Sequence, residues 1–126
     1  MKVIIAGSRV IPQRDLVWDD LVHRVLMSGV EEIVSGMARG ADQIGYEFAQ
    51  HFNIPCKQFP AEWDKHGKSA GYIRNKEMSE YADELIAYWD GKSNGTKNMI
   101  DLMAIAKKPT TIIYVWTRER FWLGHS

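Results

Sequence analysis

The stretch KVIIAGSR, residues 2–9, is the strongest indication of the fold in this sequence. After Lys2 its side chains are apolar and mostly β-branched, and Gly7 ends the run. A short apolar run that stops at a glycine is typical of a strand buried on both faces. Such strands belong to parallel sheets that helices cover on both sides. The stretch therefore predicts a buried strand followed by a loop from Gly7 to Arg9.

Outward from this strand, short apolar runs alternate with amphipathic stretches. We expect further strands at residues 31–35, 54–60, 84–89 and 110–116, and helices at residues 15–27, 42–52, 70–81 and 96–107. Asp15 is expected as the N-cap or in the first turn of its helix, and residues 61–69 are expected to be irregular. With right-handed crossovers, this alternation predicts an α/β fold: a Rossmann-like, doubly wound, mostly parallel sheet of about five strands with helices on both faces.

The composition limits the class of protein. A length of 126 residues predicts a single domain, residues 1–126, with residues 117–126 as a C-terminal tail. The 16 basic residues balance 16 acidic ones, which disfavours broad nucleic-acid binding but leaves room for a local basic groove. The single cysteine, Cys56, fits a reducing compartment, and the first apolar run is too short for a signal peptide or a membrane span. We expect a cytoplasmic protein with no membrane contact and no metal site.

Ligands of doubly wound sheets bind outside the carboxyl ends of the strands, so the loops that follow strands are the candidate site. Three of these loops are rich in glycine, hydroxyl and basic residues. Their candidate residues are Gly7, Ser8, Arg9, Gly36, Arg39, Gly40, Asp42, Asp90, Gly91, Lys92, Ser93, Gly95 and Thr96. Glycines let the backbone approach a ligand, and Arg and Lys bind phosphate oxygens. The same residue types also serve as ordinary turns and caps. Asp42 either caps its helix or accepts a hydrogen bond from a ribose.

The loop DGKSNGTKNM, residues 90–99, contains the Gly-Lys-Ser that ends a P-loop. A P-loop needs another glycine five positions before the second one. That position is Ile86, inside an apolar run, so this loop is not a P-loop.

The polar segment at residues 61–78 adds further candidates. Trp63 either stacks on a base or is a buried structural residue. Lys68 and Arg74 could reach a phosphate, and Asn75 is adjacent to Arg74.

Taken together, AGSR, SGMARGAD, GKSAGYIRNKEM and DGKSNGTKNMI resemble the SLOG superfamily, which includes the DNA-processing protein Smf/DprA and the Lonely Guy enzymes. The similarity is strongest to its YspA-type branch and covers roughly residues 2–116. The resemblance implies a Rossmann-like fold that binds a nucleotide or a nucleotide-derived ligand. It also implies pairing of subunits into a homodimer.

The resemblance to the Lonely Guy enzymes extends to individual residues. Arg74 matches their arginine, and Gly91, Gly95 and Thr96 match their glycine-rich loop. Met99 stands where those enzymes have a catalytic glutamate. A thioether cannot do carboxylate chemistry, so the resemblance leaves any enzymatic activity open and assigns no catalytic residue.

These observations give three candidate functions. The main expectation is a module that senses or sequesters a small nucleotide-type ligand, such as a nucleoside phosphate or an ADP-ribose-like molecule. The first alternative is an enzyme that cleaves an N-glycosidic or phosphate bond of a nucleotide. The second is single-stranded nucleic-acid binding through Trp63 and neighbouring basic residues. The balanced net charge makes nucleic acid the least favoured partner. No cofactor other than the nucleotide ligand is expected.

Overall fold

The computed structural model describes residues 1–115, which form one five-stranded sheet in the order β3-β2-β1-β4-β5. Every neighbouring pair of strands is parallel. The strands are β1 (Lys2–Gly7), β2 (Glu32–Ser35), β3 (Cys56–Gln58), β4 (Glu84–Trp89) and β5 (Thr110–Tyr114). This arrangement confirms the predicted Rossmann-like parallel sheet.

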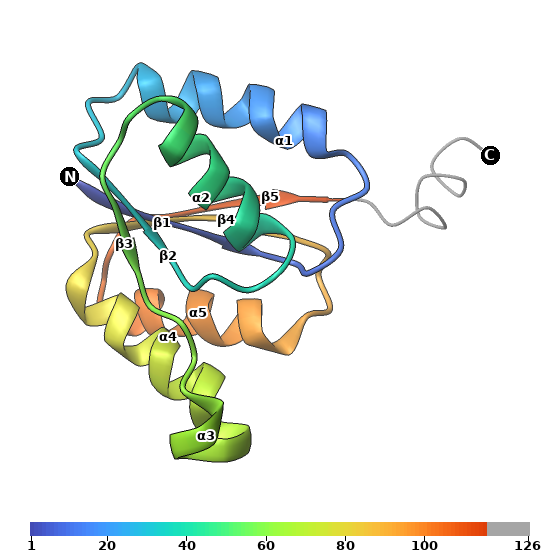
Figure 1. Ribbon diagram of the computed structural model, residues 1–126, viewed down its shortest axis with the longest axis vertical. Helices are drawn as coiled ribbons and strands as arrows, with labels where there is room; N and C mark the ends of the chain where they lie inside the picture. Colours follow the sequence, from blue (N-terminus) through green and yellow to red (C-terminus); the bar gives the residue numbers. More distant parts are fainter. Residues whose placement is uncertain (116–126) are drawn as a thin grey trace.

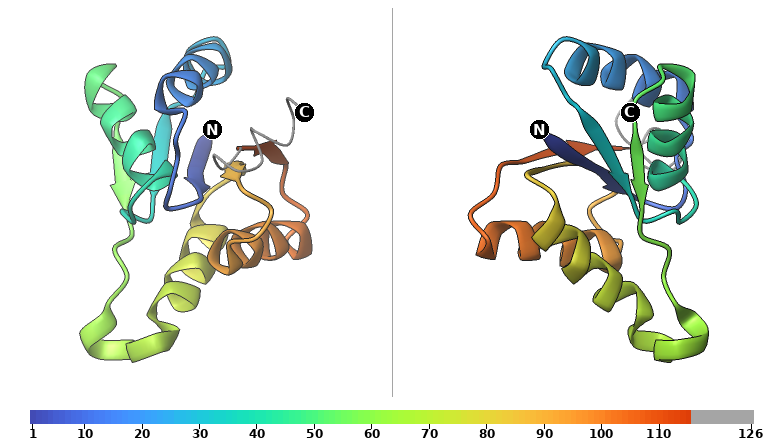
Figure 2. Two further views of the ribbon diagram at one scale, coloured as in Figure 1. Left: turned by 90° about the vertical axis from the view of Figure 1, so that its right-hand side faces the viewer. Right: turned by 60° about the vertical axis from the view of Figure 1, so that its left-hand side comes forward.

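Helices cover both faces of the sheet, as predicted (Figure 1). The helical elements are α1 (Arg14–Leu21), its π-helical continuation η1 (Val22–Leu26), α2 (Ala41–His51), α3 (Trp63–His66), the 3-10 turn η2 (Gly67–Ser69), α4 (Ala70–Tyr81) and α5 (Asn94–Ile105). Helices α1 and α2 lie on one face, and α4 and α5 lie on the other. The short helix α3 projects beyond the sheet at the start of α4 (Figure 2). None of the helices in residues 1–115 has the length and apolar character needed to cross a bilayer.

The two helical layers bury different kinds of side chain against the sheet. Under α1 and α2 the cluster includes Phe48 and Tyr88, with Trp18 packed at its edge. Under α4 and α5 it includes three buried methionines, Met78, Met99 and Met103. Methionine fills irregular gaps and presents a polarizable surface. Two of these methionines reach the carboxyl edge of the sheet, where they form part of the site described below.

Some element boundaries differ from the sequence-based expectations. Strand β3 is shorter than predicted and lies between Pro55 and Pro60, since proline cannot donate a ladder hydrogen bond. Residues 61–69, expected to be irregular, contain α3 and η2. Helix α5 begins at Asn94, two residues earlier than predicted. Asp15 lies in the first turn of α1. The predicted tail, residues 117–126, lies outside the described residues.

The order of the strands places a crevice between β1 and β4. The chain leaves β1 towards α1 on one face, and it leaves β4 towards α5 on the opposite face. Gly7 pairs with Tyr88 at the end of this strand pair. Doubly wound sheets bind their ligands at such a switch point of strand order.

Candidate functional site

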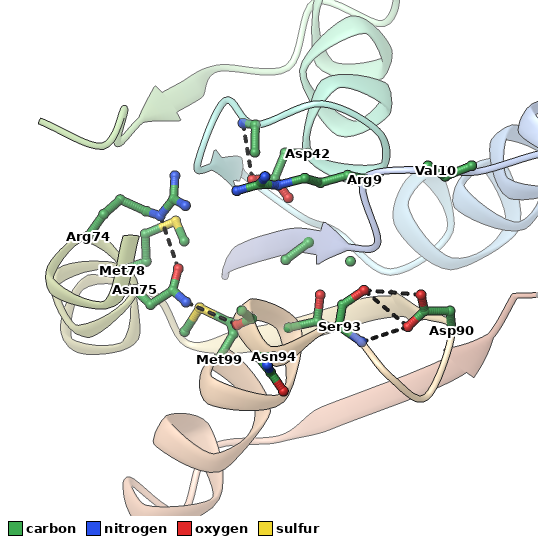
Figure 3. Close-up of a pocket in the computed structure, with 15 residues that line it drawn as sticks. Arg9, Val10, Asp42, Arg74, Asn75, Met78, Asp90, Ser93, Asn94 and Met99 are labelled. Carbon is green, nitrogen blue, oxygen red and sulfur yellow. Dashed lines mark hydrogen bonds between the residues drawn. The ribbon is translucent and has the colours of Figure 1, made fainter. Parts of the chain in front are cut away.

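A pocket of about 300 Å³ opens at the switch point between β1 and β4. Side chains from the β1 and β2 loops, α4 and the β4–α5 loop line it (Figure 3). The lining residues are Ala6, Gly7, Arg9, Val10, Ala38, Asp42, Arg74, Asn75, Met78, Asp90, Ser93, Asn94, Gly95, Thr96 and Met99. The loops chosen from the sequence therefore do meet at one edge of the sheet.

The glycines of the first two loops are required by close packing, against backbone at Gly7 and Gly40 and against side chains at Gly36. A Cβ at residue 7 would lie 2.0 Å from the carbonyl oxygen of Tyr88, and one at residue 40 would lie 2.1 Å from that of Ser8. Gly40 also has a φ of +77°, a backbone conformation that residues other than glycine rarely adopt. A Cβ at Gly36 would lie 2.6 Å from Nη1 of Arg74. These glycines hold the loops against one another rather than against a ligand.

Ser8 and Asp90 join the β1 loop to the β4 loop. The backbone N–H of Asp90 donates to Oγ of Ser8 at 2.9 Å. Oδ1 of Asp90 accepts bonds of 2.8 Å from the N–H groups of Lys92 and Ser93, which folds the loop into a tight turn. Burial alone would raise the pKa of Asp90, but the hydrogen bonds from Ser93, Lys92 and Ser8 together lower it. Asp90 is therefore a structural carboxylate that stays ionised.

Arg74 and Asn75, at the start of α4, tie three loops together. Nη1 of Arg74 donates to the carbonyl oxygens of Gly36 and Phe59, and Nε donates to Oδ1 of Asn75 at 3.0 Å. Nδ2 of Asn75 donates to the carbonyl oxygen of Gly95 at 3.1 Å. Burial lowers the pKa of Arg74, although an arginine stays charged at neutral pH. The guanidinium thus has both a structural role and a place in the pocket wall.

Asp42 is a buried carboxylate in the pocket wall. It lies in the first turn of α2, whose N-cap is Gly40, so the expected capping role is wrong. Its Oδ2 instead accepts from the N–H of Ala38 at 3.3 Å. Burial raises the pKa of Asp42 to about 6, against the lowering effects of Arg74, Ala38, Arg9 and Gly7. The carboxyl group therefore changes charge close to neutral pH.

A second, smaller hollow of about 160 Å³ adjoins the pocket. Its lining includes Gly36, Met37, Pro60, Ala61 and Trp63. Arg9, Ala38 and Arg74 line both hollows, so these three residues form a shared wall. The side chain of Trp63 is 52% exposed, which excludes the alternative of a buried structural tryptophan.

The structure divides the predicted site residues into three groups. Nine line the pocket: Gly7, Arg9, Asp42, Arg74, Asn75, Asp90, Ser93, Gly95 and Thr96. Two more line the second hollow: Gly36 and Trp63. Six line neither: Ser8, Arg39, Gly40, Lys68, Gly91 and Lys92. Ser8 is buried between loops, whereas Arg39, Lys68 and Lys92 are exposed.

Several lining residues were not predicted from the sequence. The pocket also contains Ala6, Val10, Ala38, Met78, Asn94 and Met99. Met78 and Met99 carry no chemical signal in a sequence, because methionine at helical spacing is ordinarily a core residue. Asn94 could have been included as the residue between Ser93 and Gly95. The only carboxylates among the pocket's lining residues are Asp42 and Asp90, and both accept backbone hydrogen bonds.

A solved structure shares this fold. DNA processing protein A from Helicobacter pylori, described for a unique single-stranded DNA binding mode, superposes with a TM-score of 0.65 at 23% sequence identity. The match covers 89% of this chain but 64% of that structure, so the chain spans less than two thirds of the length of its neighbour.

That description contradicts two of our expectations. We expected a small nucleotide as the ligand and ranked nucleic acid as the least favoured partner, but the protein of similar fold is one that binds single-stranded DNA. The comparison favours our second alternative instead. Net charge averages over the whole surface, so a balanced total does not exclude a local basic surface.

Sequence comparison identifies the family directly. The family model described as YspA, cpYpsA-related SLOG family matches residues 1–66. The chain is also 41% identical to the Gene 61 protein of Mycobacterium phage D29 over 106 residues, which covers 77% of this chain and 83% of the phage protein. The match to more than half of the chain agrees with the resemblance inferred from the loop motifs. The protein belongs to the YspA, cpYpsA-related SLOG family.

Proposed function

We propose that this protein binds single-stranded DNA along the carboxyl edge of its sheet. The observation that carries the proposal is the pair of arginines, Arg9 and Arg74, in the wall shared by two adjoining hollows. The single-stranded DNA binding of the H. pylori protein with a similar fold supports it. The proposal treats residues 1–126 as one cytoplasmic domain.

The charges at this edge suit a phosphate backbone. Arg9 is exposed and lies beside the pocket opening, where its guanidinium can bind phosphate oxygens. The two carboxylates of the pocket, Asp42 and Asp90, oppose an anion, and Arg9 and Arg74 in the same wall offset their charge. Asp42 is buried, and burial raises its pKa. Asp90 is hydrogen-bonded to Ser93, Lys92 and Ser8. The first backbone N–H groups of α5 also face an anion favourably.

The exposed aromatic side chain adds affinity for bases. Trp63 lines the second hollow together with both arginines. Proteins that bind single strands combine a basic groove with aromatic side chains on which bases stack. Paired bases are stacked within the duplex and do not offer their faces to a side chain. The arrangement therefore favours single strands over duplexes.

The experiment is a fluorescence anisotropy titration of a labelled oligothymidine of about 20 nucleotides, which exceeds the ~4–16 nucleotides covered by a typical single-strand-binding fold. Duplex DNA and single-stranded RNA of the same length are competitors. We expect the single DNA strand to bind more tightly than either. An equal affinity for duplex would contradict the proposal, as would absence of binding at low salt. Preference for RNA would change the assigned ligand.

Two variants, each lacking one arginine, distinguish binding at the groove from a non-specific effect of net charge. Arg9→Ala should weaken binding and reduce the salt dependence, lowering the slope of log K against log salt by about 0.7 for one lost phosphate contact. Arg24→Ala removes an arginine that lines neither hollow and pairs with Asp20. If both variants lose the same affinity and slope, the groove is not the binding surface.

A further inference from the structure

The two hollows at the carboxyl edge differ in chemistry, although they share a wall. The first has Met78 and Met99 among its lining residues, and both are almost fully buried. Thioethers make favourable contacts with aromatic rings. The volume of about 300 Å³ lies at the lower end of the range for small-molecule sites. This hollow therefore suits the face of one base with its sugar.

The second hollow presents an aromatic ring instead of thioethers. Trp63 is half exposed, and helix α4 supports it, since a Cβ at Gly71 would lie 3.7 Å from Cη2 of the indole. Pro60 and Ala61 are the neighbouring apolar residues in its lining. A tryptophan supported on one side and open to solvent on the other is a platform for a stacked base.

The wall between the hollows is the most basic part of the site. Arg9 and Arg74 reach it from different parts of the chain (Figure 3). The bonds from Arg74 to Gly36 and Phe59 hold its guanidinium in place. Two bases in the two hollows would place the phosphodiester that joins them at this wall, where both guanidinium groups can meet it.

We propose that the binding unit is one dinucleotide step of a single strand. One base enters the pocket over Met78 and Met99, the next stacks on Trp63, and the phosphate between them lies against Arg9 and Arg74. This inference rests on the proposed function and specifies its site. A base can enter the pocket only when it is unpaired and unstacked. Bases within a duplex are paired and stacked, so this site would discriminate against duplex DNA.

A ladder of short ligands tests the proposal. Calorimetry would compare thymidine 5′-monophosphate, the 5′-phosphorylated thymidine dinucleotide, and the same dinucleotide with its 5′ or 3′ base replaced by an abasic residue. We expect the intact dinucleotide to bind at least about fivefold more tightly than the mononucleotide, because stacking of a base on an aromatic side chain contributes that much or more. At least one abasic dinucleotide should fall back to the affinity of the mononucleotide.

The protein-side test removes the platform alone. Trp63→Ala should abolish the gain in affinity from the mononucleotide to the dinucleotide, because the second base loses its stacking platform. Trp63→Phe should keep most of the gain, because it retains an aromatic face. Trp63 is exposed in a short helix outside the core, so the fold should tolerate both changes.

The outcomes distinguish the two proposals. If the long oligothymidine binds but the abasic dinucleotides bind as tightly as the intact one, the dinucleotide site is wrong and the groove holds only phosphates. The same conclusion follows if Trp63→Ala keeps the full gain. If the long oligothymidine does not bind at all, the proposed function fails and the dinucleotide site fails with it.

Discussion

The carboxyl edge of the sheet contains glycines of two kinds. In the β1 and β2 loops, a Cβ at Gly7, Gly36 or Gly40 would collide with another part of the protein. At the start of α5, a Cβ at Gly95 would meet nothing within 4 Å. A glycine-rich loop therefore does not by itself indicate a ligand. The first group serves the packing of the loops, and Gly95 alone among these four leaves space open to the pocket.

The largest effect is expected at Gly40. Gly40→Ala should lower the free energy of unfolding by more than about 4 kcal/mol, a loss typical of severe steric conflict, because its Cβ would lie 2.1 Å from a backbone oxygen. Urea denaturation followed by circular dichroism measures the loss. Gly29→Ala is the control: Gly29 has a φ of +69° but nothing within 4 Å of its Cβ, so it should lose only about 1–2 kcal/mol. Equal losses would mean that backbone conformation, and not close approach, fixes the glycines of the loops.

The second prediction compares the effects of removing two arginines on DNA affinity and on stability. Arg74→Ala should weaken binding of single-stranded DNA by roughly 1.5–3 kcal/mol, the range for hydrogen bonds to charged groups. It should also reduce stability, because the carbonyl oxygen of Gly36 loses a hydrogen bond and Asp42 loses a nearby positive charge. Arg39→Ala, in an exposed residue that lines neither hollow, should change neither quantity. Anisotropy and denaturation measure both. A larger loss of affinity at Arg39 would move the binding surface away from the pocket.

A third prediction concerns pH. The pKa of Asp42 rises from 3.8 to about 6 on folding, first because of burial. The folded state therefore binds the proton more tightly, and this group makes stability fall as pH rises between 3.8 and about 6. The full penalty, on the order of 2–3 kcal/mol, remains at higher pH. Asp90, whose pKa is lowered, acts in the opposite direction by losing stability as pH falls.

Comparison with Asp42→Asn isolates the effect, because Asp90 is present in both proteins. The difference in unfolding free energy between variant and wild type should shift in favour of the variant as pH rises through this window. A bound phosphate near Asp42 would favour its neutral form further, so wild-type affinity for DNA should increase as pH falls towards 6. Parallel stability curves for the two proteins would show that Asp42 does not titrate there.

The smallest effect is expected at Gly95. Gly95→Ala should stabilise the protein by about 0.5–1 kcal/mol, since alanine is the better helix former and its Cβ meets no other atom. The same Cβ would occupy space at the pocket, so DNA affinity should fall several-fold. Because the variant is expected to be more stable, weaker binding could not be blamed on misfolding. Unchanged affinity would mean that the strand does not approach α5 closely.

The sequence predicted the elements best where local pattern and tertiary packing agree. The bounds of α4 and β4 match the prediction, and in β4 the continuous apolar run is buried over its four middle residues. Strand β3 was predicted too long, because the predicted range includes Pro55 and Pro60, which cannot donate a ladder hydrogen bond. The loops after the first, second and fourth strands were correctly predicted to lie at one edge of the sheet, because the carboxyl ends of parallel strands share one edge.

Within the site, the sequence identified residue types better than roles. Ser8 was expected to contact a ligand, but it is buried and accepts a bond from the next loop. The bond from Arg74 to Gly36 joins residues 38 positions apart, which periodicity cannot reveal. Met78 and Met99 were missed as pocket residues because only the register of α4 and α5 against the sheet brings them there.

The position of β1 at the centre of the sheet also governs when the site forms. The pocket draws its lining from Ala6 to Met99, and β1 is paired on both sides only after β4 has joined it. The segment matched by the family model, residues 1–66, lacks Arg74 and Met99. During synthesis, every residue up to Met99 must therefore leave the ribosome before the pocket is complete. Truncation before α5 should remove the pocket wall that Asn94, Gly95, Thr96 and Met99 form.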